Sequence, residues 1–238
     1  PVTEDGVLAT TSGGTGDEWT FRRYQPEDIW AFQPVKKPDL PAGKMANPID
    51  QFHQQKLADA GFKPTREADP HTLVRRATYD LIGLPPTPNE VFEFKKDYDE
   101  NPDHAMDALI DRLLASKHYG ERWAQHWLDV ARYADTGGFS NDYERSNMWR
   151  YRDWVIRSLN SDKRYDQFVI EQIAGDELAD NSLRGRIEDW DAYQKAREKG
   201  DQYNQQESEW LIASSFLRSG PWDPAMVKAP QARQLYVD

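Results

Sequence analysis

The chain has 238 residues and a formal net charge of −11. It is long enough to bury a substantial core, and its 9 Trp, 11 Tyr and 9 Phe indicate that aromatic side chains supply much of that core, which excludes disorder throughout. The negative charge, without any run of Lys or Arg, argues against nucleic acid or an anionic membrane surface as the main partner and favours a cationic or neutral one.

The chain contains no Cys, which excludes several kinds of site. Within these residues there can be no disulfide, thiolate metal site, thiol nucleophile or covalently attached c-type haem. No apolar run approaches the ~18 residues that a membrane-spanning helix needs, so no membrane span is expected.

Residues 1–46 are expected to form a linker that continues as an extended arm. The segment contains the glycine-rich run TSGGTG and prolines at positions 26, 34, 38 and 41. Glycine and proline at this density favour turns and extended backbone. The glycines are not typical of a phosphate-binding loop, because no Lys-Ser or Lys-Thr pair follows them.

From residue 47 to residue 238 the sequence predicts a helical domain. Four helix starts share one device, in which an Asn, Asp or Thr caps the helix and the following Pro occupies its first turn. They are Asn47-Pro48, Asp69-Pro70, Thr87-Pro88 and Asn101-Pro102. Gly61 and Gly83 are expected to end the first two helices.

Amphipathic spacing predicts further helices at 119–133, 148–159, 165–173 and 210–218, with a polar insertion at 184–206. No alternating strand pattern of useful length appears. The predicted fold is therefore mainly α: an irregular multi-helix domain with an extended Pro-rich N-terminal arm and little or no sheet.

Several motifs carry a resemblance to one family. They are WAFQPV from Trp30, NPID from Asn47, LVRRATYDLIGLPPTPNEV from Leu73, YGERWAQHWLDVARYAD from Tyr119, WRYRDWVIRSLN from Trp149 and EQIAGDEL from Glu171. Together they resemble the domain of unknown function that follows the planctomycete-type cytochrome c module in large exported proteins of planctomycetes and relatives. The likeness extends from about Trp30 to the C-terminus.

The resemblance implies export to the periplasm or cell surface. It also implies haem c in flanking segments only, with those segments or a redox partner as the binding partner. In the family, a stretch similar to QARQLYVD continues into a CxxCH haem-attachment motif. The 238 residues are therefore expected to be a fragment truncated at its C-terminus, with no cofactor of its own except a candidate Ca²⁺.

On the predicted helix from Tyr119, one stripe has the spacing of a core-facing surface. Its members are Trp123, Trp127, Val130 and Ala134. His126 lies near that stripe and is interpreted as a core histidine rather than a ligand or base. Asp129 and Arg132, three residues apart on another face, are expected to form an ion pair.

The connector ADTGGFSNDYERSN, residues 134–147, is the segment least explained by folding alone. Loops held between rigid helices often carry function. Its carboxylate and amide oxygens are the ligands that Ca²⁺ prefers, although their spacing is not that of an EF-hand, and an ordinary capped loop is the alternative. The candidate calcium ligands are Asp135, Asn141, Asp142 and Glu144.

Candidate ligand-binding residues extend from this connector into both flanking helices. They are His126, Arg132, Asp135, Tyr143, Trp149 and Arg152. Tyr143 or Trp149 suits stacking against a sugar, and the neighbouring arginines suit forked hydrogen bonds to a carboxylated or sulfated ligand. The favoured interpretation of the arginines is internal ion pairing. It would join Arg150, Arg152 and Arg157 to Asp153, Asp162 and Asp166.

Acid-base catalysis by two carboxyl groups is another use of these residues. Glycoside hydrolysis needs such a pair, and the candidates are Asp135, Asp142, Glu171 and Asp176. With 41 Asp and Glu residues in the chain, their presence favours no particular pair. The motifs HExxH and GxSxG are absent, which disfavours zinc hydrolases and common serine hydrolases.

Three functions stay open from the sequence. The first, which is favoured, is a non-catalytic helical module that docks or spaces haem domains in an exported electron-transfer protein. It predicts an exposed aromatic patch near the C-terminus. The second is a polysaccharide-binding module with a groove lined by Trp149 and arginines. The third is a polysaccharide-acting enzyme, which predicts converging carboxylates with at least one raised pKa.

Overall fold

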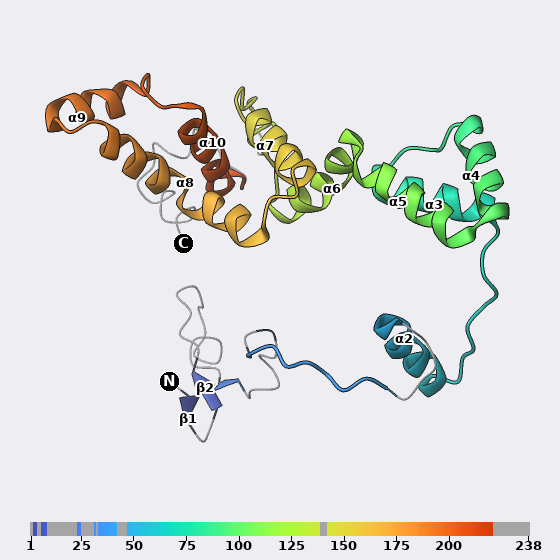
Figure 1. Ribbon diagram of the computed structural model, residues 1–238. Coiled ribbons are helices and arrows are strands. Elements are labelled where there is room, and N and C mark those ends of the chain that lie inside the picture. The colour runs from blue at the N-terminus through green and yellow to red at the C-terminus, as the bar shows by residue number, and fades with distance from the viewer. Residues whose placement is uncertain are drawn as a thin grey trace. The chain divides into compact units, whose positions relative to one another are not determined.

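The computed structural model describes residues 2–3, 6–8, 23–24, 31, 33–41, 47–138 and 142–220. It divides into two units, of which one comprises Pro1–Glu67 with Ala229–Asp238 and the other Ala68–Lys228. The described residues form nine α-helices, one 3-10 helix and three very short strands, so the mainly α prediction is confirmed (Figure 1). The division at residue 47 stays a prediction.

The first unit contains little regular structure. Strands β1 (Val2–Thr3), β2 (Gly6–Leu8) and β3 (Arg23–Tyr24) form a small antiparallel sheet in that order. Residues 34–41 form neither helix nor strand, in agreement with the predicted Pro-rich arm. Helix α2 (Pro48–Asp59) begins at the Asn47 cap, whose side chain accepts the backbone N–H of Ile49.

The second unit begins with three helices, α3 (Pro70–Ile82), α4 (Pro88–Glu100) and α5 (Pro102–Leu114). Each starts at the predicted cap, and Thr87 with Glu90 completes a reciprocal capping box at α4. Gly83 ends α3 in the left-handed conformation that glycine adopts without strain. One apolar cluster holds the three helices together, and its buried members are Val74, Phe94, Ala105, Leu109 and Leu113.

Helices α6 (Lys117–Val130) and α7 (Trp149–Asn160) pack against each other at very close range. A Cβ added to Gly120 would lie 2.5 Å from the carbonyl oxygen of Ile156, so only glycine allows this approach. Asn160 reinforces the contact, because its side chain accepts the Gly120 N–H at 2.8 Å and donates to the Lys117 carbonyl at 3.0 Å.

Helix α8 (Tyr165–Arg186) is longer than predicted, because it resumes after a kink at Ala174 instead of ending at Ile173. It packs on α10 (Gln205–Ala213), which lies beside it in Figure 1. It also packs on the 3-10 helix η2 (Ser214–Arg218). Within the polar insertion, α9 (Trp190–Lys199) packs on α8 through a separate small cluster. Its buried members are Leu183, Tyr193 and Ala196.

None of the described helices has the length and apolar character that a membrane crossing requires.

Candidate functional site

The core beneath the predicted site is built from aromatic rings. Tyr151 and Trp154 of α7 are fully buried, and Phe168 of α8 stacks on Trp154 at 5.1 Å between ring centroids. Tyr151 in turn stacks on Trp154 at 6.1 Å. The aromatic density of this part of the sequence therefore reflects one continuous stack joining two helices.

A hydrogen-bonded polar group lies inside this core. Gln172 accepts the Trp127 indole N–H at 2.9 Å and the Tyr151 hydroxyl at 2.6 Å, and it donates to the Phe168 carbonyl at 2.9 Å. Burial raises the pKa of Tyr151 to about 12. Because these groups satisfy one another, the network orders the core and leaves Tyr151 as a neutral phenol.

A buried ion pair borders the same core. The Glu171 carboxylate is 1% exposed, pairs with the Lys163 ammonium and accepts the Gln167 amide at 3.1 Å. Lys163 also lies 4.8 Å from the centroid of the Trp154 ring, within cation–π range. Of the four carboxyl groups considered for acid-base chemistry, Glu171 is the one that is buried. The Lys163 ammonium compensates its negative charge.

The described parts of the connector between α6 and α7, on either side of residues 139–141, are joined to each other by hydrogen bonds. Thr136 and Glu144 form an antiparallel bridge, and the Arg145 N–H donates to the Asp135 carbonyl at 2.7 Å. Asp142 closes the loop by accepting the Gly138 N–H at 2.8 Å. The Thr136 side chain and then this backbone N–H lower the pKa of Asp142.

Arg145 fixes this loop to the end of η2. Its guanidinium donates to the backbone carbonyls of Arg218, Ser219 and Gly220, at 3.0, 3.4 and 2.7 Å. These carbonyls belong to the last residue of η2 and the two residues after it, where backbone carbonyls lack partners within the helix and are good acceptors for a guanidinium fork. One arginine therefore anchors two segments that are 73–75 residues apart.

His126 was expected in the core, and that prediction was wrong. The ring is exposed and meets Trp123 edge-on at 5.4 Å between centroids. The predicted core-facing stripe was only partly right: Trp127 packs against the core, but Trp123 is 40% and Val130 74% exposed. Close packing at Gly120 turns the adjacent helical face inward instead, and that face contains Ala124, Trp127, Leu128 and Ala131.

Arg132 is exposed and has a left-handed backbone with φ 54°. It follows the end of α6, so the helical spacing that would bring it beside Asp129 is lost. The ion pairs of the described residues accordingly do not include one between them.

The structure does bring Asp135 and Arg152 together, around Tyr133. The Tyr133 hydroxyl donates to Asp135, while Arg152 pairs with Asp153 at 3.0 Å. Burial and then the Asp135 hydrogen bond raise the pKa of Tyr133, which keeps it protonated. Burial acts to lower the pKa of Arg152, but the hydrogen bond and charge of Asp153 outweigh it and raise that pKa.

Tyr143 and Trp149 are both exposed, as a stacking surface would require, but they line no described pocket. The Arg150 guanidinium lies 5.4 Å from the centroid of the Trp149 ring and covers part of it. Arg157 is paired internally at 2.8 Å, but with Glu209 of α10 rather than with an aspartate. The predicted pairing is thus confirmed for Arg152 with Asp153, whereas Arg157 pairs with a glutamate instead of an aspartate and the described contact of Arg150 is with the Trp149 ring.

The four candidate calcium ligands are only partly described, because Asn141 lies outside the described residues. Asp135, Asp142 and Glu144 are all exposed. Across the residues that the structure describes, no group of three His, Asp or Glu side chains could hold a metal ion. Calcium binding by this loop stays a prediction.

The carboxyl groups with shifted pKa values give no support to acid-base catalysis. Hydrogen bonds at capped helix ends lower the pKa of Asp69 and Glu90. Burial acts to raise the pKa of Glu207, but hydrogen bonds from Arg186 and Ser182 outweigh it and lower that pKa. Asp135 and Asp142 are exposed and hydrogen-bonded within the loop. The converging carboxylates that a glycosidase needs are not found among the described residues.

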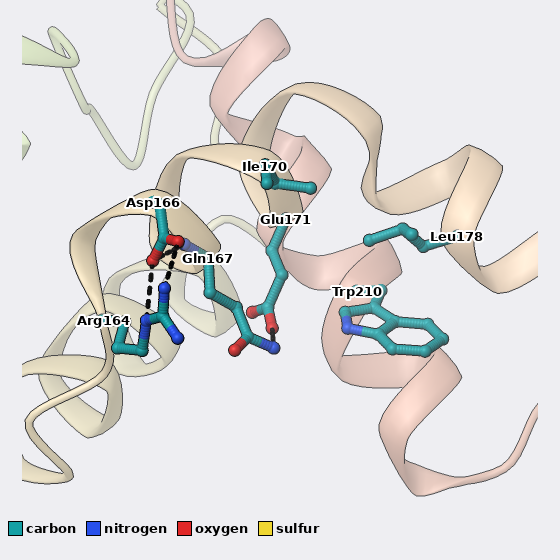
Figure 2. Close-up of a pocket in the computed structure, with 7 residues that line it drawn as sticks. All are labelled: Arg164, Asp166, Gln167, Ile170, Glu171, Leu178 and Trp210. Carbon is teal, nitrogen blue, oxygen red and sulfur yellow. Dashed lines mark hydrogen bonds and ion pairs between the residues drawn. The ribbon is translucent and has the colours of Figure 1, made fainter.

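A pocket of about 300 Å³ lies between α8 and α10, and none of the candidate ligand-binding or calcium residues lines it (Figure 2). Glu171, Leu178 and Trp210 form its inner wall, and exposed residues near the start of α8 form its rim. Except for Glu171, sequence reasoning missed these residues, because the Trp210 and Glu171 positions are far apart in the chain. The one local signal was Gly175, whose added Cβ would lie 2.1 Å from the Trp210 carbonyl oxygen.

A family model described as "Protein of unknown function (DUF1549)" and named PSCyt2 matches residues 48–238. The chain belongs to this family. The domain of unknown function indicated by the sequence motifs is thereby confirmed, while its attachment to haem-bearing segments stays a prediction.

Other comparisons add no functional argument. A stretch of 79 residues, 33% of the chain, is 30% identical to part of the catalytic subunit of DNA polymerase epsilon from Saccharomyces cerevisiae, and it spans 4% of that protein. No solved structure matches the chain.

Proposed function

We propose that the chain is a non-catalytic helical module of an exported multidomain c-type cytochrome, in which it docks or spaces haem-bearing segments. The observation that carries this proposal is the match to the PSCyt2 family over residues 48–238. The chain has no Cys and cannot attach a c-type haem itself, so the haem would belong to other segments.

The buried polar groups support a structural role. The Gln172 network and the Lys163–Glu171 pair are satisfied within the helical body, and they order the packing of α6, α7 and α8. A rigid body of this kind suits a spacer, because it holds attached segments at a fixed separation.

Helix α8 offers an apolar surface for docking. Ile170 is 52% and Ile173 58% exposed, and their spacing of three places them on the same side of the helix. The net charge of −11 favours a neutral or cationic partner surface around such a patch.

The test is a titration of the isotopically labelled chain with a separately produced haem-bearing segment of the native polypeptide, followed by NMR. Segments of one polypeptide meet at millimolar effective concentration, so weak binding is expected once they are separated. Ile173→Asp should weaken binding about tenfold or more, because it places a charge in the apolar contact.

Val130→Asp is the matched control, since Val130 is exposed on α6. Equal loss of binding in both variants, or no association at millimolar concentration, would contradict docking through α8. A native polypeptide without haem-attachment motifs would overturn the cytochrome assignment as a whole.

A further inference from the structure

The pocket between α8 and α10 is lined by both apolar and polar groups. Ile170 and Leu178 line it beside the Trp210 indole ring, while Gln167 and Glu171 contribute an amide and a carboxylate (Figure 2). The kink at Ala174 separates Leu178 from the pocket residues in the first part of α8. A single helix therefore lines the pocket on both sides of its bend.

The charges of the pocket balance one another. Arg164 at the rim pairs with Asp166 at 2.7 Å, and Glu171 pairs with Lys163 beside the pocket. Both pairs are already charge-compensated, so the pocket offers no net charge to attract an ionic ligand, whereas a neutral ligand leaves both pairs intact. The pocket is thus suited to a neutral molecule.

One polar group of the pocket has no protein partner. The Trp210 indole nitrogen is buried and lacks an acceptor, and Figure 2 shows it on the ring edge toward Gln167 and Glu171. A carboxylate offers about four acceptor positions, of which Glu171 uses two, for Lys163 and Gln167. The Gln167 side chain is exposed, so it can move away from the carboxylate oxygen that it covers.

We infer that this pocket binds a neutral polyhydroxylated ligand of the size of one sugar ring. A hydroxyl group both accepts and donates, so it can take the Trp210 N–H and donate to Glu171 in place of the Gln167 amide. The C–H faces of the ring would contact Ile170, Leu178 and the indole, as aromatic and apolar walls favour. The pocket volume lies at the lower end of the range for small-ligand sites.

Titration of the whole chain with methyl β-glucoside, followed by isothermal calorimetry and by indole fluorescence, tests the site. Trp210→Phe keeps an aromatic ring but removes the donor, and it should weaken binding about fivefold to tenfold. Ile170→Trp should abolish binding by filling the pocket from an exposed position.

Val130→Trp is the control, because Val130 is exposed on α6 and does not line the pocket. It should bind like the unmodified chain. The proposal is overturned if the unmodified chain binds no glycoside at millimolar concentration, if Ile170→Trp binds normally, or if glucuronate or glucosamine binds more tightly than the neutral glycoside.

Discussion

Gly175 shows how one residue sets the distance between two elements. Its missing side chain lets α8 approach the backbone of α10 at Trp210, so the helix pair and the pocket beside it depend on this position. Lys163 is a second residue with a large individual effect. Among the described ion pairs, the pair with Lys163 is the one that compensates the buried charge of Glu171.

Gly175→Ala should lower the free energy of unfolding by about 1–3 kcal/mol, because a methyl group would collide with a backbone oxygen that cannot turn aside. Gly185→Ala, later in the same helix, has nothing within 4 Å of the added Cβ. It should be neutral or stabilise by about 0.5–1 kcal/mol. Urea unfolding of both variants checks this, and equal effects would contradict the close-approach argument.

Lys163→Met should cost about 3–5 kcal/mol, because it leaves the buried Glu171 carboxylate without its partner. Adding Glu171→Gln removes that charge and should restore part of the loss. Thermal and urea denaturation of the two single variants and the double variant give the coupling energy. A strictly additive double variant would show that the pair does not act as a unit.

At the scale of elements, the connector after α6 has a structural role, because it holds the end of η2 in place; we call it the clasp. A backbone bridge joins its described parts, and Arg145 links it to carbonyls at the end of η2 and just beyond it. The acidic residues that suggested a metal site include Asp142, which is engaged in closing the loop. The predicted aromatic patch near the C-terminus falls largely on residues 221–238, outside the described residues.

Arg145→Ala should release the end of η2 from the connector. Hydrogen bonds from a charged donor are worth about 1.5–3 kcal/mol, so amide exchange in residues 142–148 and 216–220 should accelerate more than tenfold. Arg150→Ala is the matched control, since the described contact of Arg150 is with the adjacent Trp149 ring. Hydrogen-exchange mass spectrometry measures both, and unchanged protection in Arg145→Ala would contradict the clasp.

At the scale of the whole molecule, the helical body depends on carboxylates used as caps and internal partners. The pKa values of Asp69, Glu90, Asp142 and Glu207 are all lower in the folded chain than their usual values of 3.8 for Asp and 4.5 for Glu. Around and below those usual values the unfolded chain binds more protons than the folded chain, so folding stability falls as the pH falls.

Stability should therefore be at its full value above about pH 4.5 and decline as pH falls through the lowered pKa values. Glu207→Gln removes one contributor and should make the decline shallower, as well as lowering stability at neutral pH. Urea unfolding at a series of pH values tests this. A decline that begins above pH ~6, or one that is unchanged in Glu207→Gln, would contradict the assignment.

The sequence by itself determined the four Pro-capped helix starts and the family, because caps act over three or four residues and motifs are local. The closely spaced aromatic residues of the sequence also indicated an aromatic core. Tertiary structure alone decided which face of α6 is buried. The stripe through Trp123 and Val130 and the face that contains Gly120 both have helical spacing, but only the second packs against α7. Tertiary structure also decided that Glu171 meets Trp210 in a pocket, since that meeting depends on the close approach of two helices whose contact residues lie far apart in the chain.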